Sequence, residues 1–344
     1  MLVLVTGASG FVGSQLAPVL LAHGDRVRAL ARDPARVDVD GIMADVASSG
    51  VVKGENFEVV TADALADEGL VRALAGVEVA YYLIHSMESA SKRTQESPFP
   101  VRERIAAENF AAAAARAGVR RLVYLGGPTA DWTALRGDGE GEEDFSRELL
   151  SPHLRSREAV ERILREAVAD TVVLRASIVI GSRSRSFRFL VRLVERMPVL
   201  TLPAWHAHRT RPIDARDVID MLAGCARVAA VAGRTLDIGG PDVLSYGEMI
   251  QRIVELMLLA RPTVKLGVNM TAITARIAAA ITAEDPELVI ALMEGLQGDL
   301  LPGGSNGASH LQAADMLGVD LHSFDAAVER SLREWESLEE LTAR

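Results

Sequence analysis

Short apolar runs alternate with longer stretches of helical periodicity along the first half of the chain. The runs LVLV, RVRAL, FEVVTA, VEVAYYLI, RLVYLGG and TVVLRASIVIG have the length and residue content of buried strands. Between them lie helix-forming stretches such as FVGSQLAPVLLAHG and VRERIAAENFAAAAARAG. This alternation is typical of a parallel sheet with helices on both faces and right-handed crossovers. We therefore predict an α/β protein with a doubly wound, parallel-sheet Rossmann fold.

The pattern changes after Ser182, where helical stretches predominate and strands become fewer. No linker rich in serine, proline or glycine separates the two parts of the sequence. We predict a Rossmann domain over residues 1–182 and a smaller, mainly helical region over residues 183–344. The second region is expected to cover the substrate and to be interwoven with the Rossmann sheet. The acidic, glycine-bearing run at residues 136–145 is expected to be a mobile surface loop.

Composition narrows the class of protein. With 344 residues, of which 49% are hydrophobic, the chain can bury a sizeable core. A formal net charge of -10 gives no overall basic footprint for nucleic acid, although Arg183, Arg185 and Arg188 form a local basic cluster. The single cysteine, Cys225, cannot form an intrachain disulfide and suits a reducing compartment. The apolar stretch at residues 270–282 is too short for a membrane span, and the first residues already read as a strand rather than a secretion signal. We expect a cytoplasmic protein without nucleic-acid or membrane partners.

A glycine-rich turn, TGASGFVG at residues 6–13, follows the first predicted strand directly, and a helical pattern follows the turn. Gly7 can make the tight turn, Gly10 lets the backbone approach a pyrophosphate, and Gly13 lets helix and strand pack closely. Free amide groups and the dipole at a helix N-terminus favour negative charge, such as that of phosphates. The predicted cofactor contacts in this turn are Gly7, Ser9, Gly10, Phe11, Val12 and Gly13.

The TGxxGxxG spacing of this turn resembles that of the extended and atypical branches of the short-chain dehydrogenase/reductase superfamily. The resemblance continues through LVYLGGP at residues 122–128, LRASIVIG at 174–181, RPIDARDVIDML at 211–222 and LDIGGPDVLSYGEM at 236–249. It covers most of the chain and is greatest to NmrA-like, atypical members. The resemblance implies an NAD(P)-binding Rossmann protein whose usual catalytic residues are altered.

The end of the second predicted strand indicates which nicotinamide cofactor binds. In NAD-preferring relatives an acidic residue at this place takes the ribose hydroxyls, whereas this chain reads Leu30-Ala31-Arg32. A small residue followed by arginine leaves room for a 2'-phosphate and supplies a guanidinium that can bind it. Asp33 leaves an NAD alternative open through a shift of one residue, and Arg28 is a second, weaker phosphate candidate. We predict NADP(H) in preference to NAD(H).

The resemblance supplies further site residues. Asp63, after the third strand, matches an aspartate that contacts adenine in relatives, although a plain turn-forming aspartate fits nearly as well. The segment around Trp205 borders the substrate pocket in relatives, which makes Arg209 a weak candidate too. The His-x-His spacing there has no acidic or cysteine partner nearby, so we expect no metal site. Asp214 and Asp217 are expected to cap the next helix. The remaining predicted contacts are Leu83, Ile84, His85 and Gly126 for the cofactor, and His85, Thr129, Trp205 and His206 for the substrate.

The catalytic residues of redox relatives are replaced in this chain. Their serine falls at Gly127, and their Tyr-x-x-x-Lys pair becomes His153 and Arg157. These two stand one turn apart on a predicted helix, on the stripe that continues through Val160 and Leu164, so both should face the sheet. Arg157 can hold ribose hydroxyls or a phosphate, and His153 has the titration range to exchange a proton near neutrality. The alternative for His153 is a solvated or hydrogen-bonded residue at the helix end.

Three classes of function follow from these features. We prefer a reductase that transfers hydride from NADPH to a carbonyl or activated double bond of a small organic molecule. The second hypothesis is a regulator that binds the dinucleotide without catalysis and reports its redox state to a partner protein. The third is a non-redox epimerase or dehydratase with a tightly held cofactor. The C-terminal pattern FDAAVERSLREW can close the domain or contribute to a homodimer.

Overall fold

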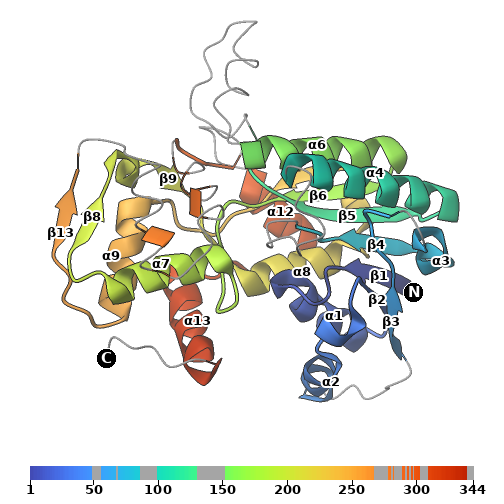
Figure 1. Cartoon of the computed structure of the whole chain (residues 1–344), viewed down its shortest axis with the longest axis horizontal. Helices are drawn as coiled ribbons and strands as arrows, with labels where there is room; N and C mark the ends of the chain where they lie inside the picture. The colour runs from blue at the N-terminus through green and yellow to red at the C-terminus, as the bar shows by residue number, and fades with distance from the viewer. Residues whose placement is uncertain are drawn as a thin grey trace, which may run out of the picture.

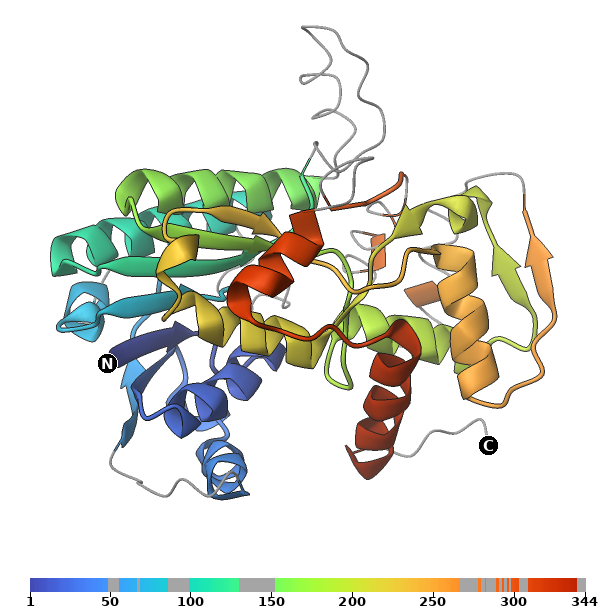
Figure 2. The same cartoon turned by 180° about the vertical axis from the view of Figure 1, so that it is seen from behind.

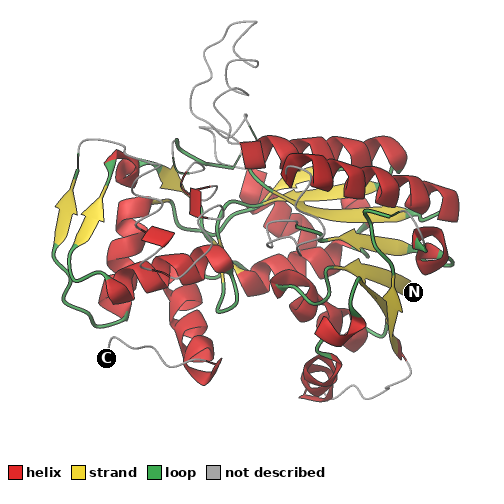
Figure 3. Ribbon diagram, in the orientation of Figure 1, coloured by secondary structure: helices red, strands yellow, loops and turns green. Residues whose placement is uncertain are grey.

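The chain folds around one large parallel β-sheet with helices on both faces, beside a second, mainly helical body (Figure 1; Figure 3). In this computed structural model the described residues are 1–48, 56–66, 69–85, 99–129, 152–266, 278–279, 282, 289–290, 293, 296, 298–302 and 309–338. The loop predicted at residues 136–145 lies outside these ranges. Across the described residues, no helix has the length and apolar content that a membrane crossing requires.

The central sheet has seven strands in the order β11-β6-β5-β4-β1-β2-β3. Every neighbouring pair is parallel, which confirms the predicted doubly wound α/β fold. The strands are β1 Leu2–Thr6, β2 Arg26–Ala31, β3 Phe57–Thr61, β4 Val79–Tyr82, β5 Arg121–Gly126, β6 Thr171–Arg175 and β11 Thr235–Asp237.

Two helical layers bury the two faces of the sheet. Successive side chains of β1 point to opposite faces, so Val3 and Val5 enter one core while Leu2 and Leu4 enter the other. Both sets are buried, which explains why the strand is a continuous apolar run instead of an alternating one. The first layer is α1 Phe11–Ala22, α2 Val39–Ser48, α8 Ala215–Cys225 and α12 Ser309–Leu317, and the second is α3 Leu70–Leu74, α4 Phe99–Ala117 and α6 Pro152–Ala167.

The second body packs around its own core, in which Phe187, Trp205, Tyr246 and Trp335 are buried. Residues after 182 supply both bodies, because α8, β11 and α12 return to the sheet. Figure 2 shows the C-terminal helices running across the junction between the two bodies. The other elements are η1 Pro34–Arg36, β7 Val179–Ile180, α7 Arg185–Arg196, β8 Leu200–Leu202, η4 Ala204–Ala207, β9 Arg209–Thr210, β10 Ile213–Asp214, η5 Ala229–Val231, β12 Leu244–Ser245, α9 Tyr246–Leu256, β13 Thr263–Lys265 and α13 Phe324–Leu338.

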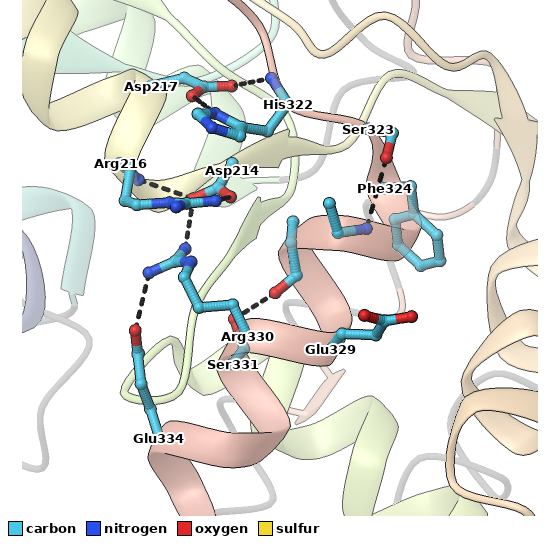
Figure 4. A network of polar contacts seen from close by, with 12 residues as sticks. Asp214, Arg216, Asp217, His322, Ser323, Phe324, Glu329, Arg330, Ser331 and Glu334 are labelled. Atoms are coloured by element: carbon cyan, nitrogen blue, oxygen red, sulfur yellow. Dashed lines mark hydrogen bonds and ion pairs between the residues drawn. The ribbon is translucent and has the colours of Figure 1, made fainter.

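A polar network ties α13 to the start of α8 at this junction (Figure 4). Asp214 caps α8 as predicted, since its carboxylate accepts a 2.8 Å hydrogen bond from the Arg216 amide. The Arg330 guanidinium of α13 donates to the same carboxylate. Asp217 is not a cap; it accepts hydrogen bonds from the backbone amide of His322, at 2.9 Å, and from its ring, at 2.6 Å. The network fixes α13 against the sheet-bound helix.

Candidate functional site

A cavity of about 1190 Å³ lies at the carboxyl ends of the sheet strands, with walls from both bodies of the molecule. Open α/β sheets bind ligands at this edge. The cavity exceeds the roughly 300–1,000 Å³ of typical small-molecule pockets, so it can hold a dinucleotide together with a second molecule. The predicted site residues that line it are Gly7, Ser9, Gly10, Phe11, Val12, Gly13, Arg32, Asp63, Leu83, Ile84, His85, Gly126, His153, Arg157 and Trp205.

The glycine turn has the geometry of a phosphate cradle. Gly7 has a positive φ of 66°, and a Cβ there would lie 2.8 Å from the Leu83 carbonyl oxygen. A Cβ at Gly13 would lie 2.3 Å from the Gly7 carbonyl oxygen, so only glycine lets α1 pack this closely on the turn. Gly10 is the N-cap of α1, without a side-chain cap, and the first turn carries no acidic residue. The amide groups of that turn therefore fit the pyrophosphate of a dinucleotide.

Hydrogen bonds through Thr6 align the strand ends beside this cradle. The Thr6 hydroxyl donates to the Tyr81 carbonyl, at 3.0 Å, and accepts from the Leu83 amide, at 2.8 Å. The end of β1 is thereby joined to the end of β4, so the glycine turn and the segment from Leu83 to His85 share one wall of the cavity.

Two arginines stand at the cavity wall beyond β2. Arg32 is exposed directly after the strand, and Arg36 of η1 also lines the cavity. Asp33 lines the same region, but its carboxylate accepts a 3.1 Å hydrogen bond from the Ala35 amide and so caps η1. Arg28 is wrong as a phosphate candidate. Its guanidinium binds Glu58, at 2.7 Å, and carbonyl groups at the end of α3, away from the residues that line the cavity.

Thr129 and His206 are not among the described residues that line the cavity, so their role as substrate contacts stays a prediction. The Thr129 hydroxyl accepts a 3.2 Å hydrogen bond from Arg175, and the His206 ring lies 2.9 Å from the Pro203 carbonyl oxygen. Arg209 forms a 2.8 Å ion pair with Asp299 instead of facing the cavity.

Asp63 combines the two roles that the sequence left open. Its carboxylate accepts a 3.0 Å hydrogen bond from the Leu65 amide, as in an Asx turn, and the residue also lines the cavity. A contact with adenine through this aspartate stays a prediction.

Arg157 is held firmly at the inner wall of the cavity. Its guanidinium donates to the Leu125 carbonyl and lies over the Tyr124 ring, 4.9 Å from the ring centroid. The Tyr124 hydroxyl in turn donates to the Arg157 carbonyl, at 3.2 Å. A second guanidinium nitrogen, Nη1, is buried, lies 3.8 Å from the Glu103 carboxylate and makes no hydrogen bond to a described residue. That nitrogen fits a bound hydroxyl or phosphate oxygen.

His153 faces the cavity, but its environment favours the neutral ring. Burial, and then the charge of Arg157, lower the pKa of His153 from 6.5 to about 4. The ring stacks on His85 with centroids 5.0 Å apart and an interplanar angle of 12°. At neutral pH His153 is therefore a neutral hydrogen-bonding group, and the expectation of a proton donor titrating near neutrality does not fit it.

Sequence reasoning missed Glu103, which α4 brings beside this pair of histidines. Its carboxylate is only 2% exposed, lies 3.8 Å from Arg157 Nη1 and 3.7 Å from His85 Nδ1, and accepts a 2.7 Å hydrogen bond from Ser156. A signal was present in the sequence, because Glu103 stands at helical spacing from Ala107 and other buried residues of α4. An acidic residue on an apolar stripe indicates a buried polar role.

The basic wall at the start of α7 was also not assigned to the site. Arg183, Arg185 and Arg188 all line the cavity. Their clustering is visible in the sequence, but there it was related only to nucleic-acid binding and not to this cavity.

The fold and the glycine cradle define a dinucleotide-binding protein of the Rossmann class, and similarity to known proteins agrees. Residues 7–192, more than half of the chain, match the NAD(P)H-binding family, so the chain belongs to this family. This confirms the predicted NAD(P)-binding Rossmann class. The chain is 26% identical over 268 residues to the 2-alkyl-3-oxoalkanoate reductase of Stenotrophomonas maltophilia (strain K279a), covering 74% of this chain and 75% of that protein.

Solved structures of other proteins share the fold over nearly the whole chain. The UDP-glucuronic acid 4-epimerase of Bacillus cereus, in complex with UDP-glucuronic acid and NAD, superposes with a TM-score of 0.66 at 17% identity, over 98% of this chain and 100% of that one. DesIV, a dTDP-glucose 4,6-dehydratase of Streptomyces venezuelae with NAD bound, gives a TM-score of 0.67 at 20% identity, over 98% of each chain. At these identities the similarity shows the fold alone. This fold fits the resemblance to extended short-chain dehydrogenases/reductases that the sequence suggested.

Proposed function

We propose that the protein is an NADP(H)-dependent reductase that transfers hydride to the carbonyl group of a small organic acid. The observation that carries this proposal is the cavity, which joins a phosphate cradle to a basic and apolar chamber at the carboxyl edge of the sheet. Membership of the NAD(P)H-binding family supports the cofactor class. The similarity to a reductase over three quarters of each chain supports the reaction class.

The preference for the phosphorylated cofactor is supported by charge at the end of β2. Arg32 and Arg36 both line that part of the cavity, whereas the carboxylate of Asp33 already caps η1. A 2'-phosphate beside two guanidinium groups gains charge-assisted hydrogen bonds that a plain ribose cannot make.

The acidic nature of the substrate is supported by the charges that line the cavity. Its described lining residues include seven arginines and two aspartates, in a chain whose formal net charge is -10. The chamber beyond the glycine turn is otherwise apolar, with Ile178, Phe189, Leu190, Trp205 and Leu296 on its walls. An anionic head with an apolar tail fits both features. The related reductase is named for a 2-alkyl-3-oxoalkanoate, an oxo acid with alkyl substituents, which agrees with this substrate class.

The residues of the chain would bind and orient the cofactor and the substrate. The reduced cofactor supplies the hydride when it is bound. The glycine turn would hold the pyrophosphate, and Arg157 would hold ribose hydroxyls through its Nη1, which lies beside Glu103 and makes no hydrogen bond to a described residue. Trp205 and the apolar wall would exclude water from the reacting carbonyl.

The test is a turnover assay of purified protein with NADPH and matched pairs of substrates. Each 3-oxo acid of increasing alkyl length is compared with its methyl ester, and the loss of NADPH absorbance is followed. We expect kcat/KM to be at least about tenfold higher for the acid, because a charged hydrogen bond contributes about 1.5–3 kcal/mol. Equal rates for acid and ester would contradict the substrate class, and no turnover across the panel would contradict the reductase.

The replaced catalytic tyrosine favours one second candidate, a regulator that binds NADP(H) without catalysis. Calorimetric titration separates the two functions, because such a regulator must bind NADP+ and NADPH with different affinities. A large difference in affinity without turnover would support the regulator.

A further inference from the structure

We propose that His85 and Glu103 form the acid–base pair that exchanges the substrate proton, in place of the missing tyrosine. The inference rests on the proposed reductase function and extends it. The family resemblance implies His85 only as a cofactor and substrate contact, and neither it nor the glycine motif indicates Glu103. His85 is the catalytic residue of the pair, and Glu103 is the residue that positions it.

The geometry of the pair supports this assignment. The Glu103 Oε1 atom is buried, lies 3.7 Å from His85 Nδ1, and has no hydrogen-bond partner among the described residues. The Oε2 atom of the same carboxylate accepts the 2.7 Å hydrogen bond from Ser156 and is thereby fixed. Gaps of 3.7–3.8 Å from Oε1 to His85 and Arg157 are closed by a small adjustment or by a bridging water.

His85 also has access to the cavity. Its side chain is 40% exposed and lines the cavity, so a ring whose Nδ1 faces Glu103 presents Nε2 to a bound substrate. A carboxylate behind one ring nitrogen fixes the tautomer and stabilises the imidazolium when it forms. This is the arrangement that a proton-exchanging histidine requires.

His153 is the weaker candidate for the same role. It stacks on His85, and in the described part of the chain no carboxylate lies within ion-pair distance of its ring. Its Nδ1 is buried and has no described hydrogen-bond partner. The stacked ring therefore holds the plane of His85, and of the two histidines only His85 lies within ion-pair distance of the Glu103 carboxylate among the described residues.

The proton balance of carbonyl reduction follows from this pair. A bound reduced nicotinamide would supply the hydride that the carbonyl carbon gains and would itself be oxidised, while the electron pair of the C=O π bond would move to oxygen. The His85 ring is neutral at rest near neutral pH; the fraction that takes up a proton from solvent through the cavity gives it from Nε2 to that oxygen. In alcohol oxidation the neutral ring accepts the proton.

The charges around His85 set the pH dependence. Glu103 of α4 faces the ring from one side, and His153 and Arg157 of α6 and Arg185 of α7 act on it from the others. Desolvation of the ring by the protein groups around the cavity, followed by the charges of Arg157, His153 and Arg185, lowers the pKa of His85 well below its usual value of 6.5. Reduction should therefore accelerate as the pH falls toward that pKa. The negative charge of Glu103 should keep the pKa of His85 from falling further.

The first test is an NMR titration of the His85 ring in protein without cofactor, in the wild type and in Glu103→Gln. Removing the carboxylate should shift the midpoint by about one pH unit toward acid, because an opposite charge at this distance shifts a pKa by roughly 1–3 units. Glu108→Gln on the exposed face of the same helix is the matched control and should leave the midpoint unchanged. An unchanged midpoint in Glu103→Gln would overturn the pair, whatever the turnover.

The second test keeps the proposal falsifiable should Glu103→Gln fail to fold. His85→Gln changes a partly exposed side chain, and we expect kcat to fall at least about 100-fold with loss of the acid limb of the pH profile, as for removal of a general acid. Wild-type kcat and pH profile in His85→Gln would overturn the proposal. If the His85 midpoint shifts in Glu103→Gln but the wild-type protein reduces no substrate, the pair would be supported and the proposed reductase function would be contradicted.

Discussion

Arg32 is the residue on which the choice of cofactor depends. The Arg32→Ala variant should bind NADPH about 10- to 100-fold more weakly, since it loses a charged hydrogen bond of about 1.5–3 kcal/mol. NADH has no 2'-phosphate, so its affinity should stay the same. Fluorescence titration with both cofactors measures the two changes.

Arg26→Ala is the matched control, because Arg26 is exposed at the opposite end of the same strand. It should leave both affinities unchanged. An Arg32→Ala variant that loses NADPH and NADH affinity equally would mean that Arg32 binds a part shared by both cofactors.

His153 should make the stability of the protein sensitive to mild acid. Its pKa is about 4 in the fold and 6.5 when unperturbed, so between these values the unfolded chain binds the proton more tightly. The stabilisation is complete above pH 6.5 and is lost as the pH falls toward 4, by at most about 3 kcal/mol. Urea unfolding at pH 7 and pH 5 measures how much free energy of unfolding is lost between the two pH values. This loss should be about 2 kcal/mol smaller in His153→Asn than in the wild type. Equal losses in the two proteins would contradict the buried neutral ring. His23→Asn changes a histidine on the surface and is the control, whose loss should match the wild type.

Some site residues could be predicted from the sequence because their signals are local. The spacing of Gly7, Gly10 and Gly13 after a strand, and the helical stripe that carries Arg157, depend on neighbours within a few residues. The partnership of Glu103 with His85 depends on how α4 packs beside the end of β4, which no local pattern encodes. The hydrogen bond that the Thr129 hydroxyl accepts from Arg175 of a neighbouring strand was not predictable for the same reason.

At the level of elements, α13 is fastened to α8 through a buried carboxylate (Figure 4). Asp214 is fully buried, and Arg330, 18% exposed, is one of its charged partners, while Arg216 is another. The Arg330→Ala variant should lower the free energy of unfolding by about 1–3 kcal/mol, because the carboxylate then loses a charged hydrogen bond but keeps Arg216. Urea unfolding measures the loss.

Arg333→Ala on the same helix provides the comparison. Its side chain is 75% exposed and pairs with Glu329 at 3.7 Å, so the expected loss is below about 0.5 kcal/mol. Equal losses in the two variants would show that the junction does not depend on Asp214.

Long elements with clear periodicity were predictable, and short ones that need a distant partner were not. The strands β1 to β6 appear as apolar runs, whereas β11 has only three residues and is defined by its pairing with β6. The pattern therefore indicated a parallel sheet without indicating that the sheet is completed by residues 235–237.

On the scale of the whole molecule, the cofactor should stabilise both bodies together. NADPH at about 100 times its Kd should add about 2.7 kcal/mol to the free energy of unfolding. Because the two bodies share the cavity wall and the α8–α13 network, calorimetry should show one transition that moves to higher temperature. In Gly13→Ala the added Cβ would lie 2.3 Å from the Gly7 carbonyl oxygen, so NADPH should not raise the Tm of that variant.

Gly298→Ala tests the same kind of change where a Cβ meets open space, and its response to NADPH should match the wild type. Two separate transitions, of which NADPH moves only one, would contradict the coupling of the two bodies.

The late position of β11 in the chain has a consequence for synthesis on the ribosome. While the chain is emerging, β6 has an open hydrogen-bonding edge until residues 235–237 are released and reach it. An unpaired strand in a hydrophobic sheet can template aggregation. Fragments that stop near residue 182 would retain this edge, so they should need chaperone protection that the finished polypeptide does not.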